Sequence, residues 1–342
     1  MVTPGRRRVT IADVASHAQV SVTAVSKVIR NAYGVSPAMR ERVKNAIDEL
    51  GYRPQVVARG MRGRTFTIGL MLPHIRNPFF ADILDGLTEY LQSTDYQAFM
   101  IQGGATRKVE SRAVDALMDR QVDGIIMVAP LASKARLEEV AKEKPTVVLA
   151  RHERSSYYDS VHDDDEAGAE LVVNHLIALG HRRIAHITHQ DDSHARPSDL
   201  LHNIRAATYE RVMREHGLAD EIAVAKSFHH ERGGYEGARE LLSRSPRPTA
   251  IFAGADQAAL GALAAVHEAG LAVPVDVSVA GYDNTHLGAL PYIALTSVDQ
   301  DGAVMGRAAG QLLLERVEGR MSAVRFTVTP SLVVRGSTGE AA

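Results

Sequence analysis

From residue 65 onward the chain alternates between short strand-like runs and longer helix-like runs. Apolar runs at residues 65–72, 98–101, 124–128, 146–149, 183–188, 249–252 and 277–281 are predicted strands. Stretches such as residues 78–92, 164–179 and 256–269 are predicted helices. This alternation indicates an α/β fold with parallel sheets joined by crossover helices. Roughly 270 residues exceed one hydrophobic core, so we expect two lobes.

The first 54 residues have another pattern, which predicts an all-α unit of three short helices. Each predicted helix follows a residue that can cap it: Thr10, Ser21 and Ser36. Apolar residues recur at helical spacing, and Pro37 and Gly51 mark the start and the end of the third helix. The predicted helices therefore span residues 11–18, 22–30 and 37–50.

Charge is distributed unevenly between this head and the rest of the chain. Residues 1–65 contain 12 Lys+Arg and 4 Asp+Glu, a balance of +8. The whole chain contains 39 and 41, so the remainder has 27 basic and 37 acidic residues, a balance of −10. A basic head on an acidic body indicates that the head binds a polyanion such as DNA. A disordered basic tail is the alternative, but the helical periodicity argues against it.

The first two helices have the spacing of a helix-turn-helix. The small Ala15 allows a close helix crossing, and Val20 fills the turn. A recognition helix enters the major groove by its N-terminal end, where hydroxyl and ammonium groups can bind base edges and an apolar side chain can touch a thymine methyl group. The predicted DNA-contacting residues are Thr10, Ser21, Val22, Thr23, Ser26 and Lys27, with the last four exposed on the second helix.

Other function classes lack their signatures in this sequence. We find no nucleophile elbow, phosphate-binding loop, dinucleotide fingerprint or zinc-protease motif, so no enzyme and no cofactor is expected. No cysteine is present, and no apolar run is long enough to span a membrane. The N-terminus does not resemble a secretory signal, so we expect a cytoplasmic, nucleoid-associated protein.

Two groups of side chains could suggest a metal site. Asp163, Asp164 and Asp165 precede a predicted helix, where acidic residues complement the helix dipole, so capping is the favoured interpretation. His186, His189 and His194 could bind zinc, but a polar loop explains them equally simply. We therefore predict no metal.

The head resembles the lactose-repressor (LacI/GalR) family of bacterial transcription regulators. The matching segments are residues 10–15, 20–21, 25–28, 35–36, 40–43, 50–52 and Pro54. In that family residues 1–54 would be the DNA-binding domain and residues 55–64 a hinge helix that lies in the minor groove. The resemblance implies that Met61 is the apolar wedge between base pairs and that the small Ala58 allows two hinges to approach.

The body resembles the periplasmic sugar-binding-protein fold that this family carries as a sensor. Matching segments include residues 77–80, 122–125, 175–181 and 281–283. The resemblance implies an effector-binding and dimerisation domain at residues 65–342, with ligand bound in a cleft near the carboxyl ends of the strands. Lobe one is expected at residues 65–162 and 299–324, and lobe two at residues 163–294 and 325–338.

The resemblance also implies a set of effector-binding residues. Two phenylalanines follow the first strand and could stack on a sugar ring, although core packing is the alternative. Charged and amide side chains at strand ends can bind hydroxyl groups; for the aspartate, a turn or helix cap is the alternative. The predicted residues are Phe79, Phe80, Arg151, Arg205, Asp283 and Gln300, and His229 lies near a position that often holds an aromatic ligand contact.

These features predict a homodimeric repressor of double-stranded operator DNA, controlled by a sugar or sugar derivative. A nucleobase-responsive regulator of the same family is an alternative, because Asp283 and a phenylalanine ring would also suit a base. A sugar-binding protein without a regulatory role is a further alternative, which the basic head argues against. Some relatives form tetramers through a C-terminal leucine heptad, whereas residues 325–342 alternate like a strand.

Overall fold

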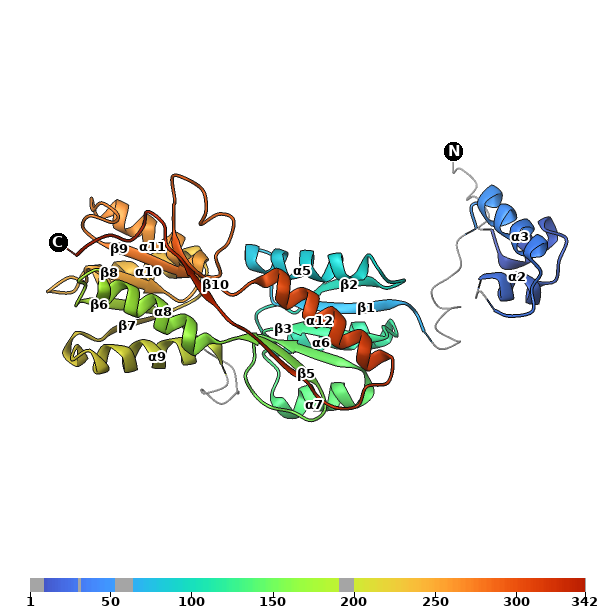
Figure 1. Ribbon diagram of the computed structural model, residues 1–342, viewed down its shortest axis with the longest axis horizontal. Helices are drawn as coiled ribbons and strands as arrows, with labels where there is room; N and C mark the ends of the chain where they lie inside the picture. Colours follow the sequence, from blue (N-terminus) through green and yellow to red (C-terminus); the bar gives the residue numbers. More distant parts are fainter. Residues whose placement is uncertain (1–8, 30–31, 53–63, 191–199, 342) are drawn as a thin grey trace. The chain divides into compact units, whose positions relative to one another are not determined.

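The computed structural model describes residues 9–29, 32–52, 64–190 and 200–341 (Figure 1). The chain divides into two compact units, Met1–Thr65 and Phe66–Ala342. Among the described residues, no helix combines the length and apolar character that a bilayer crossing needs.

The head unit contains the three expected helices, α1 (Ile11–His17), α2 (Val22–Ile29) and α3 (Pro37–Leu50). Thr10 caps α1 in a capping box with Asp13, and Gly51 ends α3 in the left-handed conformation with φ of 60°. Val14, Val25 and Val43 form the centre of a small core to which all three helices contribute. The observed boundaries agree with the predicted ones to within one residue.

The larger unit contains two six-stranded sheets, and each sheet forms one lobe. The first has the order β11-β5-β4-β3-β1-β2, with all pairings parallel. Its strands are β1 (Thr67–Leu72), β2 (Gln97–Gln102), β3 (Gly124–Val128), β4 (Thr146–Leu149), β5 (Asp159–Asp163) and β11 (Arg325–Val328).

The second sheet has the order β12-β10-β9-β8-β6-β7, in which only the edge strand β12 is antiparallel. Its strands are β6 (Ile184–His189), β7 (Ala223–Ser227), β8 (Ala250–Ala253), β9 (Ser278–Tyr282), β10 (Thr296–Asp299) and β12 (Ser331–Val333). Because five neighbouring strands run parallel, their carboxyl ends lie at one edge of the sheet.

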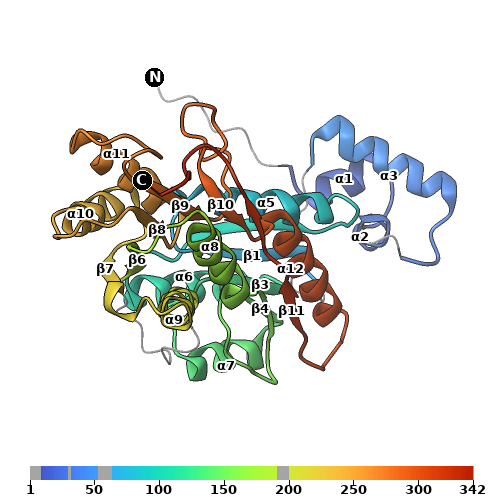
Figure 2. The same cartoon turned by 60° about the vertical axis from the view of Figure 1, so that its left-hand side comes forward.

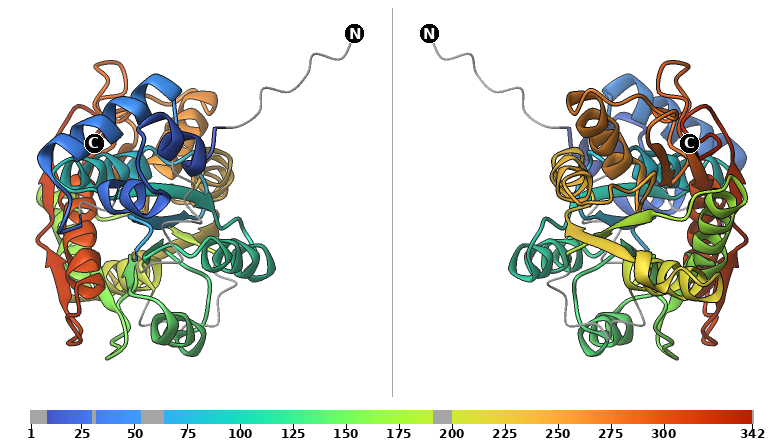
Figure 3. Two further views of the ribbon diagram at one scale, coloured as in Figure 1. Left: turned by 90° about the vertical axis from the view of Figure 1, so that its right-hand side faces the viewer. Right: turned by 90° about the vertical axis from the view of Figure 1, so that its left-hand side faces the viewer.

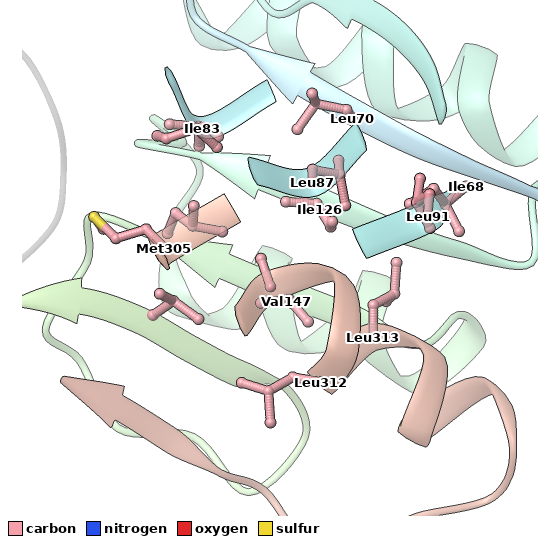
Figure 4. Close-up of a cluster of buried hydrophobic side chains, with 14 of the residues drawn as sticks. Ile68, Leu70, Ile83, Leu87, Leu91, Ile126, Val147, Met305, Leu312 and Leu313 are labelled. Carbon is pink, nitrogen blue, oxygen red and sulfur yellow. The ribbon is translucent and has the colours of Figure 1, made fainter. Parts of the chain in front are cut away.

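Helices cover both faces of each sheet, as crossover connections require (Figures 2 and 3). In the first lobe, α5 (Pro78–Leu91) packs beside α12 (Gly302–Val317) on one face, and α6 (Arg107–Asp119) and α7 (Lys134–Glu143) cover the other. Figure 4 shows Leu87 of α5 and Leu313 of α12 in the core beside Ile68 of β1. In the second lobe, the pairs are α8 (Asp165–Ala178) with α9 (Leu201–Glu215), and α10 (Glu231–Leu242) with α11 (Asp256–Glu268).

The chain passes between the lobes three times, after β5, β10 and β11 (Figure 1). The lobe boundary expected at residue 325 is wrong, because β11 pairs in parallel with β5 of the first sheet. Only β12 returns to the second sheet, where it pairs with β10. The alternation of Phe326 and Val328 correctly indicates a strand, but local alternation carries no information about which sheet edge the strand joins.

Candidate functional sites

The recognition helix α2 presents three of its four predicted base-reading side chains to solvent. Ser21 precedes the helix, and its hydroxyl accepts a 3.1 Å hydrogen bond from the amide of Ala24. Val22 is 45% exposed, and Thr23 and Lys27 are also exposed. The exposed face of α2 therefore has an apolar group and a hydroxyl in its first turn and the Lys27 ammonium group in its last turn, which suits contacts with base edges.

Ser26 is not exposed, so the prediction for its orientation is wrong. Only 6% of its surface is accessible, because it lies beside Val25 and Val28 on the face of α2 that packs within the head. The buried stripe of a short helix between two others is wider than its apolar residues alone suggest.

Thr10 lies at the exposed N-terminus of α1. Its backbone amide donates to the Asp13 carboxylate at 2.7 Å, and its hydroxyl accepts from the Asp13 amide at 3.3 Å. The capping of α1 is a sufficient structural reason for a threonine at position 10, so the contact of Thr10 with DNA stays a prediction. Ala58 and Met61 of the expected hinge lie outside the described residues.

Phe79 belongs to the core of the first lobe, as the core-packing alternative predicts, and its contact with an effector stays a prediction. The ring is 5% exposed and packs closely against Gly302, where α5 meets α12. Phe80 is half-buried, and its ring centroid lies 5.4 Å from that of His74. Of the two predicted rings, Phe80 is therefore the more exposed.

Arg151 is buried and fully engaged inside the first lobe. Its Nη2 atom lies 2.7 Å from both carboxylate oxygens of Glu153, and Nη1 donates to the carbonyl oxygen of Pro130 at 2.5 Å. This side chain would have to break a buried ion pair to bind an effector, which costs several kcal/mol. The ion pair accounts for Arg151 without a ligand, so its contact with an effector stays a prediction.

Arg205 is a buried residue of α9, and its side chain reaches the carboxyl end of β8. Its Nε donates to Asp165 at 2.5 Å and its Nη1 donates to the carbonyl oxygen of Gly254 at 2.8 Å. The guanidinium also lies 3.4 Å from the ring centroid of Tyr282. Burial opposes ionisation of Asp165, but the charge of Arg205 and the bond to His152 lower the pKa of Asp165 overall.

The three consecutive acidic residues have three different roles. Asp164 is the N-cap of α8 and accepts from the amide of Ala167 at 3.0 Å, as capping predicts. Asp165 pairs with Arg205, whereas Asp163 accepts a 2.5 Å hydrogen bond from the hydroxyl of Tyr282. Burial, followed by the charge of Asp165, raises the pKa of Asp163 to about 7.

Asp283 and Gln300 meet at the carboxyl ends of the neighbouring strands β9 and β10. Gln300 Nε2 donates to Asp283 Oδ1 at 2.7 Å, and Asn77 Nδ2 donates to Asp283 Oδ2 at 3.4 Å. Burial and the nearby charge of Asp256 raise the pKa of the Asp283 carboxyl well above its usual value. Asn77 comes from the first lobe, where its Oδ1 also accepts from the amide of Phe79 and caps α5. We call Asn77, Arg205, Asp283 and Gln300 the effector site.

Sequence reasoning missed Asn77 as a site residue. The Asn-Pro pair at residues 77–78 predicts the start of a helix, which explains Asn77 as a cap. It gives no sign that the Nδ2 group of Asn77 also donates to Asp283. It also missed Gln257, whose Nε2 donates to the carbonyl oxygen of Arg76 across the lobes at 3.3 Å. Neither contact has a local sequence signal, because each joins residues about 180 or more positions apart.

Histidines gather at the other end of the same sheet edge. The ring centroid of His189 lies 5.1 Å from that of His202 and 5.0 Å from that of His229. Beside them Phe228 is 45% exposed and stacks on His230, so an exposed aromatic ring lies next to His229 in the sequence. Within the described residues no group of three or more side chains has metal-binding geometry, and His194 lies outside them.

Comparisons with known proteins cover nearly the whole chain. The profile of bacterial regulatory proteins of the lacI family matches residues 10–55, and the profile of the periplasmic binding protein-like domain matches residues 173–338. Catabolite control protein A of Priestia megaterium is 34% identical over 89% of this chain and 91% of its own length. The ribose operon repressor of Haemophilus influenzae is 32% identical over 96% of this chain and 98% of its own length.

A third relative and two solved structures agree with these matches. The transcriptional repressor PurR of Aliivibrio fischeri is 34% identical over 96% of this chain and 98% of its own length. The lac repressor dimer bound to operator and the anti-inducer ONPF superposes with a TM-score of 0.82 at 27% identity, over 97% of this chain and 100% of that chain. The complex of the regulator CelR with cellobiose has a TM-score of 0.72 at 31% identity, over 96% and 100%.

Proposed function

The chain belongs to the LacI family of bacterial regulatory proteins, and we propose that it is a homodimeric repressor whose operator affinity is controlled by a sugar derivative bound at the effector site. Membership of this family makes the chain a DNA-binding transcription regulator and not an enzyme. Members of the family dimerise, and paired heads match operators with two-fold symmetry. We place its action at DNA of the bacterial nucleoid, in the cytoplasm.

The observation that carries the effector proposal is the meeting of Asn77, Asp283 and Gln300 from both lobes. A carboxyl group between two amide groups can exchange these donors for the hydroxyl groups of a ligand, and a few precisely placed polar groups of this kind fix the orientation of a ligand. Because Asn77 belongs to one lobe and Asp283 to the other, a ligand that binds both changes the energy of lobe closure. This supplies the differential affinity that an effector needs to shift a conformational equilibrium.

For DNA, the proposed base-reading residues are Val22, Thr23 and Lys27. Thr10, Ser21 and Ser26 act by capping and packing the helices that position them, with phosphate contacts available at Thr10 and Ser21. The proposal for the hinge keeps Met61 as the wedge and Ala58 as the site of close approach, on the strength of the family resemblance alone.

A nucleobase effector is the second candidate. The chemistry of the site favours it, since Asp283 can accept a hydrogen bond from a ring N–H group as well as from a hydroxyl. Phe80, half-buried beside His74, offers a ring face for stacking.

The test has two stages with the full-length protein. An operator is first selected from random duplex DNA, and specific binding is measured at fixed salt because phosphate contacts make affinity salt-dependent. Sugars, sugar derivatives and purines are then screened for a change in melting temperature and in operator affinity. Selection of no preferred sequence would refute the regulator, and operator affinity that no compound changes would refute control by an effector of these classes.

A further inference from the structure

The carboxyl edge of the second sheet has two chemically different ends. The strand order β10-β9-β8-β6-β7 places Asp283 and Gln300, which follow β9 and β10, toward one side. His189 ends β6 and His229 follows β7 at the other side (Figure 1). Gly254, which follows β8 and whose carbonyl oxygen accepts a hydrogen bond from Arg205, lies between them. A ligand along this edge therefore meets a carboxylate at one end and imidazoles at the other.

The imidazoles form a defined cluster, which we call the histidine end: His189, His202 and His229. Their ring centroids lie 5.0 to 6.4 Å apart in edge-to-face arrangements. The amide of His229 donates to Nδ1 of His189 at 3.2 Å, which leaves the Nε2 atom of His189 to carry the proton of the neutral ring. Neutral and charged imidazoles can both donate hydrogen bonds from Nε2, so the cluster is suited to a ligand rich in acceptors.

His229 has an unused polar atom at this edge. Its buried Nε2 has no hydrogen-bond partner among the described residues, and the ring lies against Gly254, where an added Cβ would approach Nε2 to 2.9 Å. A buried polar group without a partner costs free energy and calls for a ligand or water to bind it. The largest electrostatic influences on His229 among the described residues come from basic groups: His186, His189, His202 and Arg205.

The first lobe contributes a further imidazole to the same region. His74 follows β1, its Nδ1 is buried without a partner among the described residues, and its ring packs against Phe80. Burial is the largest influence lowering the pKa of His74, the charges of Arg76 and His230 lower it further, and Glu231 raises it. Each lobe therefore contributes a buried imidazole nitrogen without a partner among the described residues, and Arg205 of the effector site acts electrostatically on the ring of His229.

We propose that the effector carries anionic oxygens, as a phosphate or carboxylate group, which bind at the histidine end while its hydroxyl groups bind Asp283. This inference rests on the proposed function and names the class of its effector. A neutral sugar would satisfy only the Asp283 end. A sugar phosphate or sugar acid matches both ends, with acceptor oxygens opposite the imidazoles and donor hydroxyls opposite the carboxylate.

Anion binding at this place is coupled to proton uptake. Burial, followed by the neighbouring His189 and His202, lowers the pKa of His229 well below its usual value, so the ring is neutral at pH 7 in the free protein. A bound anion favours the charged imidazole and raises its pKa. The affinity for the anion therefore increases as pH falls, by up to about tenfold per pH unit for each proton taken up.

The first experiment uses inorganic phosphate, so that it does not depend on the identity of the sugar. Melting temperatures of the full-length protein are measured in phosphate and in chloride of equal ionic strength at pH 6 and pH 8. We expect phosphate to raise the melting temperature more at pH 6 and the effect to be lost in His229→Gln. His216→Gln changes an exposed histidine at the end of α9 and is the matched control, expected to behave as wild type. His202→Gln provides a second test variant if His229→Gln does not fold.

The second experiment separates the sources of the anion. Titration calorimetry compares D-ribose, D-ribose 5-phosphate, D-glucose, D-glucose 6-phosphate and D-glucuronate, in two buffers of different ionisation enthalpy to count protons taken up. The inference requires an anionic compound to bind at least about tenfold more tightly than its neutral parent, with proton uptake and dependence on His229. A neutral sugar that binds equally well and releases operator DNA would overturn the anionic class while leaving the proposed function intact. Stabilisation by zinc in place of phosphate would also overturn it, because the imidazoles would then be metal ligands.

Discussion

Gln300 Nε2 donates a 2.7 Å hydrogen bond to Asp283 Oδ1, and this bond joins the ends of two strands at the place where the chain leaves the second lobe. Asp283 receives its other donor, at 3.4 Å, from Asn77 of the first lobe. Asp283 is thus hydrogen-bonded both to Gln300, where the chain crosses between the lobes, and to Asn77 of the opposite lobe. This relationship makes Asp283 the residue through which ligand binding and lobe movement are most directly connected.

Asp283→Ala is therefore expected to weaken effector binding by about 10- to 100-fold, since a buried donor left without its acceptor costs roughly 1–3 kcal/mol. Operator binding without effector should stay within about twofold of wild type, because the head is a separate compact unit. Calorimetry with the effector and a gel-shift titration with operator measure the two effects. Asp283→Ala protein that responds to the effector at wild-type concentrations would exclude this carboxylate from the site.

Thr23→Ala and Lys27→Ala are expected to reduce specific operator affinity by roughly 1–3 kcal/mol each if the side chain contacts a base edge. Affinity for random DNA should change less, since phosphate contacts dominate that binding. Competition titrations with operator and random duplexes give the ratio. Ser26→Ala is the matched comparison: its side chain is buried, so it should alter the stability of the head more than the specificity. Equal losses on both kinds of DNA for Thr23→Ala and Lys27→Ala would rule out base reading.

His186 should make the larger unit less stable in mild acid. Burial lowers the pKa of His186 to about 3, although Nδ1 lies 2.9 Å from the carbonyl oxygen of Phe252. The unfolded chain takes up this proton below about pH 6.5, so stability is full above that pH and falls as pH decreases toward 3. Between pH 6.5 and 5 the loss from this residue is about 2 kcal/mol. Urea unfolding of wild type and His186→Asn at both pH values should show a flatter dependence in the variant; parallel curves would contradict the prediction.

The contribution of Asp163 to the stability of the larger unit should have the opposite dependence on pH. Its pKa is raised to about 7 by burial and by Asp165, so its contribution to stability is full at low pH and is lost as pH rises through 7. Asp163→Asn retains an oxygen that can accept from the Tyr282 hydroxyl and has no charge to repel Asp165. We expect the variant to be more stable than wild type at pH 8, by on the order of 1 kcal/mol, and to differ less at pH 5. Thermal unfolding at the two pH values tests the sign, and a variant less stable at pH 8 would disprove it.

The assembly is expected to be a dimer that binds one near-palindromic operator. Residues 325–341 are used within the larger unit: β11 and β12 join the two sheets, and the amide of Ala341 donates to the carbonyl oxygen of Leu179. This segment is therefore not available as a leucine-heptad helix. Light scattering at micromolar concentration should give about twice the chain mass of 37.0 kDa. A stable tetramer would show that another surface makes a second interface.

The sequence by itself determined the elements whose signals are local. Caps at Thr10, Ser21 and Ser36 located the three head helices, and apolar runs such as Gly124–Val128 located buried strands. These features depend on residues within a few positions of each other, so a single pass along the chain detects them. The family resemblance then added the positions of Arg205, Asp283 and Gln300 as candidates.

Only the tertiary structure decided which side chains meet and which way they face. The polar strand Asp159–Asp163 is buried because strands cover it on both sides, and β11 joins its edge although the chain between them is more than 160 residues long. Phe79 faces the core because α12 returns beside α5, and Asn77 reaches Asp283 because the lobes meet. Local patterns record backbone preference and periodicity, whereas these contacts arise from pairing between distant segments, whose partners no short stretch of sequence specifies.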